Sequence, residues 1–321
     1  MDIQVLIENV TNPALLFFVL GVIAVQIKSD LEIPENSSKF ISIYLLLSIG
    51  FKGGQELSHS GMNLEILSSI FLGLFLAITI PVSSFLILKR KMSVANAGAI
   101  AASYGSVSAV TFVTATSFLE FEAISFNGHM IAVMAIMEAP AIVMGVMLIN
   151  YYKKDKKSND KSGISKLLWH SVTNGSVILI FGSLIIGFTV SAEHAEGIKP
   201  FTTDIFKGFL AIFLLDMGIT SGKQLSLLVS KGLSPFLFSS LMPFVNGLIA
   251  LFISQQITDN PGNQLLFAIL GASASYIAVP AAMKQIVPDA NPSLYLPMAL
   301  GITFPINVIL GIPFYYTLII M

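Results

Sequence analysis

The sequence predicts an all-α polytopic membrane protein, with ten transmembrane helices arranged as two inverted five-helix repeats and with broken or pinched crossing helices. Composition is the first observation behind this prediction. Of the 321 residues, 55% are apolar and only 11% are charged, and the mean hydropathy of +0.83 is too high for a soluble domain of this length. The second observation is that short motifs recur in the same order 162 to 169 residues apart. A duplicated half in an apolar chain is typical of secondary transporters.

The duplication rests on four pairs of matching segments. They are Val10-Thr11-Asn12 with Val172-Thr173-Asn174, LLLSIGFKGGQEL ending at Leu57 with FLLDMGITSGKQL ending at Leu225, GSVSAV ending at Val110 with ASYIAV ending at Val279, and Pro140 with Pro305. Each match alone is weak. Four matches in one order and at nearly constant spacing indicate an internal repeat.

A transmembrane helix needs about 20 mostly apolar residues, so the chain has room for roughly ten. The alternating pattern of a membrane β-barrel is absent, and helices are therefore expected. The ten apolar runs are Pro13–Ile27, Phe40–Gly54, Ile66–Leu88, Val94–Leu119, Met130–Asn150, Ser171–Val190, Phe206–Ile219, Pro235–Ile257, Gln264–Val287 and Leu294–Ile320.

The second and seventh runs are short, as expected of matching positions in a repeat. Each ends in a pair of glycines four residues apart, which are Gly50 with Gly54 and Gly218 with Gly222. Such pairs allow two helix backbones to approach closely. The alternative is that the glycines cap the C-terminal ends of the two helices.

Loops on alternate sides of the ten runs differ in positive charge. One side carries 14 of the 17 Lys and Arg residues, and the other carries only Lys52, Lys199 and Lys207. The positive-inside rule places the lysine-rich side in the cytoplasm and both termini outside. With five helices per half, the second half is inverted. The expected units are residues 1–150, a cytoplasmic linker at 151–167, and residues 168–321.

The absence of cysteine excludes disulfides, thiol nucleophiles and Cys-ligated metals, and a formal net charge of −1 argues against a nucleic-acid partner. Lysines of the 151–167 linker are expected to contact anionic headgroups of membrane lipid. A site for a regulatory protein is the alternative interpretation of this charged segment.

The fourth and ninth runs contain serine-rich segments at equivalent points of the repeat, Gly105–Thr111 and Ser273–Val279, and the binding site is expected there. A broken backbone at that depth is tolerated only where it is buried or lines a cavity. The N-terminal ends of half-helices suit a small anion, and carbonyl and hydroxyl oxygens suit Na⁺. The predicted anion-binding residues are Gly105, Ser106, Ser108, Ala109, Ser273, Ser275, Tyr276 and Ile277, and the predicted Na⁺-binding residues are Ser108, Thr111, Glu138 and Ser275. The alternative is that these small residues only permit the helices to cross.

Glu138 and Asp216 are the clearest ionisable residues within the apolar runs. An acidic residue at the centre of a transmembrane helix raises the free energy of insertion by at least about 2.5 kcal/mol, so each of these two residues is expected to have a functional or structural role. Glu138 precedes Pro140, and it is predicted to bind a cation, to relay a proton, or to satisfy backbone groups freed by the proline. Asp216 matches Ser48 of the first repeat and is expected at a lumen or an interface.

Four motifs resemble the cyanobacterial-type, sodium-dependent bicarbonate permease superfamily over essentially the whole chain. They are IGFKGG at Ile49–Gly54, GSVSAVT at Gly105–Thr111, MEAP at Met137–Pro140 and VPDANPSLY at Val287–Tyr295. The resemblance implies a homotrimer in the bacterial inner membrane, Na⁺-coupled bicarbonate uptake, and a site where the fourth and ninth helices cross. It implies no cofactor beyond Na⁺ as the coupling ion. The family's hydroxyl-bearing motif maps onto Gly105, Ser106, Ser108 and Thr111, and its counterpart onto Ser273, Ser275 and Tyr276.

The sequence departs from the family pattern in two places. Tyr276 stands where cyanobacterial members have an aspartate, and the linker at 151–167 is much shorter than theirs. The first departure leaves another small anion as an alternative substrate, with a bile-acid-symporter-like or auxin-efflux-like carrier as the alternative class. The second bears on whether a PII-like regulatory protein binds. An intramembrane serine hydrolase is the remote alternative, because no histidine lies in the paired segments.

Overall fold

The computed structural model describes residues 13–60, 63–153, 175–229 and 232–320, and every regular element among them is a helix. In the first half these are α2 (Pro13–Gln26), α3 (Glu35–Ser60), α4 (Leu64–Leu88), α5 (Val94–Gly105), α6 (Ala109–Phe121) and α7 (His129–Tyr152). In the second half they are α9 (Gly175–Thr189), α10 (Ala192–Glu196), η1 (Pro200–Asp204), α11 (Phe206–Val229), α12 (Leu233–Ser254), α13 (Pro261–Ala272), α14 (Ala278–Ile286), α15 (Pro292–Pro297), η2 (Met298–Thr303), α16 (Phe304–Ile306), η3 (Asn307–Gly311) and α17 (Ile312–Ile320).

The all-helical membrane class is confirmed. Six helical stretches of the described residues are long and apolar enough to cross a membrane, namely Leu64–Leu88, Val94–Phe121, His129–Tyr152, Pro200–Leu225, Leu233–Ser254 and Pro292–Ile320. Two shorter apolar helices are Leu15–Gln26 and Val177–Thr189. The ten predicted runs fall mainly on helix where the structure describes them, with a break inside the fourth and another inside the ninth, but their arrangement as ten inverted spans remains a prediction. Most of the 151–167 linker and both Val-Thr-Asn motifs lie outside the described residues.

The second and seventh helices are longer than their short apolar runs. Helix α3 has 26 residues and α11 has 24. Both continue past their apolar runs into polar sequence, such as Gln55 and Glu56 in α3. A helix satisfies its own backbone hydrogen bonds whatever its side chains are, so a loss of hydropathy does not end it.

The paired glycines lie within their helices and serve close packing. A Cβ atom on Gly54 would collide with the carbonyl oxygen of Leu184 in α9, and one on Gly218 would collide with that of Phe18 in α2. The C-cap interpretation does not hold, because α3 and α11 both continue beyond these glycines. Helix α3 therefore packs closely on α9, and α11 packs closely on α2.

The two close contacts are equivalent under the sequence repeat. Gly50 meets Ser183, and its counterpart Gly218 meets Gly21. Gly21 and Ser183 are themselves 162 residues apart, which is the offset of the Val-Thr-Asn motifs. The first helix of each half thus packs on the second helix of the other half, and this exchange interlocks the two halves.

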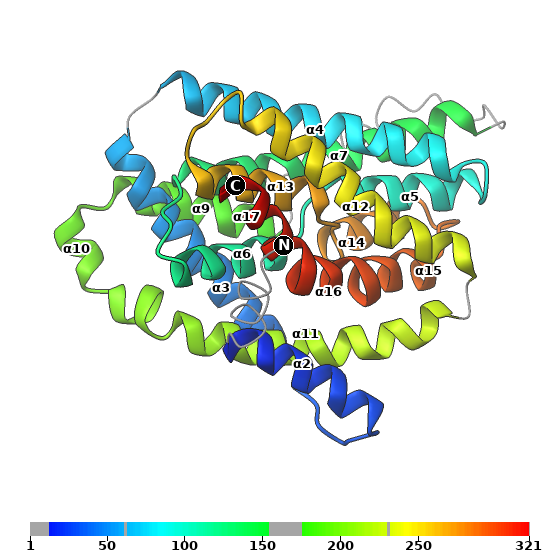
Figure 1. Ribbon diagram of the computed structural model, residues 1–321, viewed down its shortest axis with the longest axis horizontal. Coiled ribbons are helices and arrows are strands. Elements are labelled where there is room, and N and C mark those ends of the chain that lie inside the picture. Colours follow the sequence, from blue (N-terminus) through cyan, green and yellow to red (C-terminus); the bar gives the residue numbers. More distant parts are fainter. Residues whose placement is uncertain (1–12, 61–62, 154–174, 230–231, 321) are drawn as a thin grey trace.

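Connections that alternate along the chain gather at opposite ends of the molecule. In Figure 1, α10 lies at the left end and the α4–α5 connection lies at the right end. The end of α7 and the start of α5 both contact the α14–α15 connection, because Lys153 pairs with Asp289 at 3.0 Å and the Asn291 amide donates to Asn96 at 2.8 Å. At the opposite end, the Asn127 amide donates to Asn263 at 2.9 Å. The connections that meet through these contacts are the same ones that the charge pattern assigns to one side of the membrane.

Candidate functional site

The fourth and ninth predicted helices are both broken in their middle. In the fourth, α5 ends at Gly105 and α6 begins at Ala109. Gly105 packs so tightly on the ring of Pro81 in α4 that a Cβ atom would not fit. Ser108 then caps the new helix, because its Oγ accepts a hydrogen bond from the amide of Thr111 at 3.1 Å. The backbone groups released by the break are thereby partly satisfied.

The break in the ninth helix is built in a similar way. Helix α13 ends at Ala272 and α14 begins at Ala278. Ser275 Oγ accepts from the amide of Val279 at 3.3 Å. Pro280 at the third position of α14 has no N–H, and the first turn of a helix is where its absence costs least.

The two breaks are joined directly by hydrogen bonds. The Ser275 amide donates to the Ser103 carbonyl at 2.7 Å, and the Ser103 hydroxyl donates to the Ser275 carbonyl. The Ser108 amide donates to Ser273 Oγ at 3.1 Å. All four serines are buried, so these bonds replace hydrogen bonds that water would otherwise make. The crossing of the fourth and ninth helices is therefore held by hydrogen bonds between the two breaks.

A small cavity opens beside this crossing. The breaks contribute the residues from Val107 to Val110 and from Ser275 to Ala278, while α7 contributes Met134 and Glu138. The rest of the wall comes from Ser42, Leu45, Leu46, Val113, Ile180 and Phe213. Its volume is about 40 Å³, where a single water needs about 10 to 15 Å³. The cavity has room for a few water-sized groups and is much too small for a steroid.

Six of the predicted site residues line the cavity, and four do not. Those that line it are Ser108, Ala109, Glu138, Ser275, Tyr276 and Ile277. Gly105 and Ser273 instead build the crossing, as described above. Ser106 and Thr111 are buried at the break, and their hydroxyl oxygens have no hydrogen-bond partner among the described residues. An oxygen without a partner at this depth is available as a cation ligand.

Glu138 is the acidic residue of the cavity. Its side chain is buried with 6% exposed, and Oε1 has no hydrogen-bond partner among the described residues. No lysine or arginine belongs to the wall as the structure describes it. A buried carboxylate without an ionic partner has to be neutralised, either by a proton or by a bound cation.

Tyr276 lines the cavity where the related permeases were expected to have an acid. Its ring lies edge-on to Phe304 at 6.0 Å between centroids, and its hydroxyl donates to the sulfur of Met217 at 3.6 Å. The tyrosine thus closes one side of the cavity without adding a second carboxylate.

The wall contributed by α3, α9 and α11 was not predicted. Ser42, Ile180 and Phe213 come from ordinary apolar stretches that carry no local signal of a site. Asp216 lies one turn beyond Phe213 on α11, buried, and accepts a hydrogen bond from Ser38 of α3. It is not part of the cavity wall as the structure describes it, and its position at a lumen or an interface stays a prediction.

The comparisons with known proteins agree with this geometry. Residues 13–320 match the model of the Na⁺-dependent bicarbonate transporter superfamily. No curated protein matches the chain. The match covers both broken helices and the cavity between them. It describes a transporter family and no enzyme family, which rules out the hydrolase interpretation.

Proposed function

Because the chain belongs to the Na⁺-dependent bicarbonate transporter superfamily, we propose that this multi-pass membrane protein imports bicarbonate together with Na⁺ across the bacterial inner membrane. The cavity at the helix crossing is the single observation that carries the proposal. It combines the N-terminal end of α6, two serines and one unpaired carboxylate in a space for a few small groups.

The anion is held by hydrogen-bond donors and not by a basic side chain. The first amides of α6 have no partner within their helix, and the positive end of its dipole points at the break. Ser108 and Ser275 add hydroxyls from the two halves of the protein. This arrangement suits a small, planar, singly charged anion such as bicarbonate.

Na⁺ supplies the positive charge that the cavity wall lacks. Glu138 provides a carboxylate oxygen, and the unpartnered hydroxyls of Ser106 and Thr111 lie at the same break. Oxygen ligands of this kind suit a hard cation. With the anion and Glu138 both negative, binding of the anion requires Na⁺, and this requirement is the basis of coupling.

Another small anion with Na⁺ or H⁺ is the second candidate function. Tyr276 favours it, because a family carboxylate is replaced there by a neutral hydroxyl. A bile-acid-like solute is disfavoured by the cavity volume of about 40 Å³. We also propose termini outside and a homotrimer, which are tested by labelling and by mass measurement in detergent. The short 151–167 linker disfavours a PII-like partner, and pull-down tests this.

Uptake of labelled bicarbonate into proteoliposomes tests the proposed function. A Na⁺ gradient should raise the initial rate at least about tenfold over K⁺ alone, which corresponds to about 1.4 kcal/mol of coupling. Formate, nitrate and acetate are included as competitors. Equal uptake without Na⁺ after the proton gradient is collapsed would refute the coupling, and stronger transport of a competitor would refute bicarbonate.

A further inference from the structure

A second and larger cavity lies at the α10 end of the molecule. Its volume is about 510 Å³, and its wall is built by α3, α6, the α6–α7 connection, α7, α10, the α10–η1 connection, η1 and the first residue of α11. Charged residues of the wall are Lys52, Glu56, Glu120, Glu196 and Lys199. We call this cavity the vestibule. The charge pattern of the loops places it on the outer side of the membrane.

The vestibule continues the helix faces that line the crossing cavity. On α6, Val110 and Val113 line the crossing cavity, and Thr116 and Glu120 line the vestibule. Residues three or four apart on a helix share a face. The two cavities are therefore stacked along one face of α6.

Helices α3 and α7 show the same order. Leu45 of α3 lines the crossing cavity, and Ile49 and Lys52 of the same helix line the vestibule. On α7, Met134 lines the crossing cavity and Ile131 lines the vestibule. Buried apolar side chains separate the two spaces by about one helical turn. The vestibule is thus the approach to the crossing cavity from outside.

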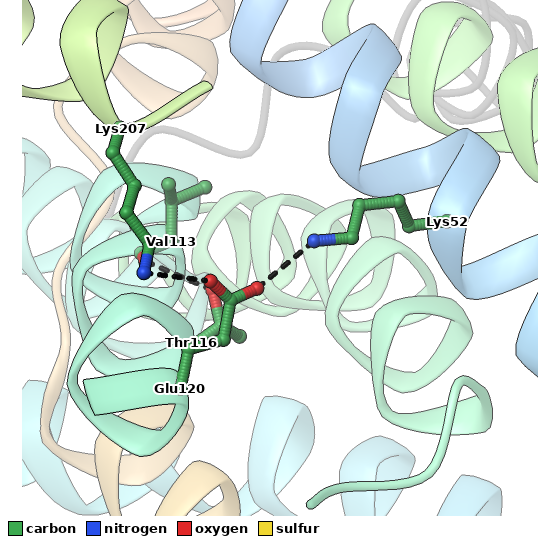
Figure 2. Close-up of polar contacts among 5 residues, drawn as sticks. All are labelled: Lys52, Val113, Thr116, Glu120 and Lys207. Atoms are coloured by element: carbon green, nitrogen blue, oxygen red, sulfur yellow. Dashed lines mark hydrogen bonds and ion pairs between the residues drawn. The ribbon is translucent and has the colours of Figure 1, made fainter. Parts of the chain in front are cut away.

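Glu120 stands on the vestibule wall between two lysines from different helices. Its Oε1 lies 2.9 Å from Nζ of Lys52 on α3, and its Oε2 lies 3.9 Å from Nζ of Lys207 on α11. Figure 2 shows the two ammonium groups reaching the carboxylate from opposite sides. Lys52 also lies 5.7 Å from the ring centre of Phe206.

The position of Glu120 is unfavourable on its own helix. It lies in the last turn of α6, where the free carbonyls and the negative end of the dipole repel a carboxylate. The lysine pair offsets that repulsion. About a third of each of the Lys52 and Glu120 side chains is exposed, so an ion in the vestibule can reach both.

Positive charge is scarce on this side and concentrated at this point. The outer loops and helix ends carry three of the 17 basic residues, and two of them hold Glu120. The third, Lys199, pairs with Glu196 at 2.9 Å within its own short segment. A carboxylate held at both oxygens presents the O–C–O geometry that bicarbonate shares.

From this geometry we propose that Lys52 and Lys207 form an outer docking site for a carboxylate-shaped anion, occupied by Glu120 at rest. An arriving bicarbonate exchanges with Glu120 and is thereby concentrated above the crossing cavity. The identity of the anion rests on the proposed function, but the docking site itself does not.

Initial rates of bicarbonate uptake at saturating Na⁺ test the site. Lys52→Ala and Lys207→Ala should each raise KM about twofold to fivefold, as for the loss of a partly exposed ion pair, with Vmax within twofold. Glu120→Gln keeps both lysines and removes the competing carboxylate, so KM should fall about threefold. The matched control is Lys199→Ala, which removes one charge from the same cavity and should leave KM unchanged. An equal rise in KM for this control would mean general charge attraction and would overturn the site.

Calorimetric titration separates the docking site from the proposed function. Ser108→Leu fills the crossing cavity, so sodium bicarbonate titrated into this variant, with sodium chloride as the blank, reports only the outer site. Binding should be stronger with Glu120→Gln added and lost when Lys52→Ala is added as well. If the wild type shows no bicarbonate uptake but the Ser108→Leu variant still binds bicarbonate, the proposed function is refuted and the docking site is not. Uptake with unchanged KM in both lysine variants, and no calorimetric binding, would refute the docking site alone.

Discussion

At the scale of single residues, the crossing cavity divides its chemistry between hydroxyls and one carboxylate. Ser108 and Ser275 both line the cavity and both accept a hydrogen bond from the first turn of a helix. Glu138 faces them from α7 with one oxygen unpartnered among the described residues. Substitutions at these positions therefore separate anion binding, cation binding and packing.

Ser108→Leu is expected to abolish transport. The leucine fills a cavity of about 40 Å³ and removes the hydroxyl, but it keeps an apolar side chain in a buried position. Initial uptake should fall at least tenfold, while the elution volume on gel filtration stays that of the wild type.

Ser240→Leu is the matched control for Ser108→Leu. Ser240 lies on α12, and its hydroxyl bonds only its own helix, at the carbonyl of Phe236. Uptake by this variant should stay within twofold of the wild type. Normal transport by Ser108→Leu would show that the small residues of the break are there for packing.

Glu138→Gln is expected to weaken Na⁺ binding without unfolding the protein. The change removes a charge and keeps the volume, and interactions with a charged group contribute about 1.5 to 3 kcal/mol. The Na⁺ concentration for half-maximal uptake should rise about tenfold to a hundredfold. If the variant keeps its Na⁺ dependence but has a lowered melting temperature, Glu138 has a structural role and satisfies backbone groups of α7 near Pro140.

At the scale of elements, the close crossings of α3 with α9 and of α11 with α2 set the frame around the cavity. Gly218→Ala on α11 places a Cβ atom against the backbone of α2. We expect it to destabilise the protein by about 1 to 3 kcal/mol, as overpacking does. Thermal unfolding in detergent measures the effect.

Gly208→Ala is the control on the same helix, because no described atom lies within 4 Å of its added Cβ. There, alanine should be neutral or stabilise by up to about 1 kcal/mol through helix propensity. Equal destabilisation by both variants would mean that α11 tolerates no substitution, and that Gly218 has no special contact.

The sequence predicted the breaks well, because serine, glycine and proline change the backbone locally. Ser108 and Ser275 each accept a hydrogen bond from an amide three or four residues further along the chain, and such short-range effects are visible in a sequence. The exchange of α2 and α9 between the halves could not be predicted in this way. Gly21 and Gly218 meet across about 200 residues of chain, and nothing local to either glycine specifies its partner.

The difference between local signals and long-range contacts also explains which residues of the candidate site could be predicted from the sequence. Glu138 was found because a carboxylate in an apolar helix is conspicuous. Phe213 and Ile180 were missed because the sequence does not show whether an apolar residue faces lipid, a neighbouring helix or a cavity. Lys52 and Lys207 entered the sequence argument only as loop charges, and their convergence on Glu120 is a property of the fold.

At the scale of the whole molecule, the alternation of its two ends can be tested by labelling. The natural sequence has no cysteine, so single cysteines can be introduced without removing any. A cysteine at Glu193 of α10 should react in intact cells with an impermeant maleimide. One at Asp289 should react only after the cells are opened. The opposite result would invert the assignment of the vestibule to the outer side.

The serine hydrogen bonds of the crossing also constrain how the protein is made. Ser103 and Ser275 are 172 residues apart, so the partner of the first break is synthesised late. At about 5 to 20 residues per second, this interval is roughly 10 to 35 s. During it, the first break lies in the bilayer without the partners that later satisfy its backbone, which is costly in hydrocarbon. We therefore expect the first half to need shelter by the insertion machinery until the ninth helix arrives.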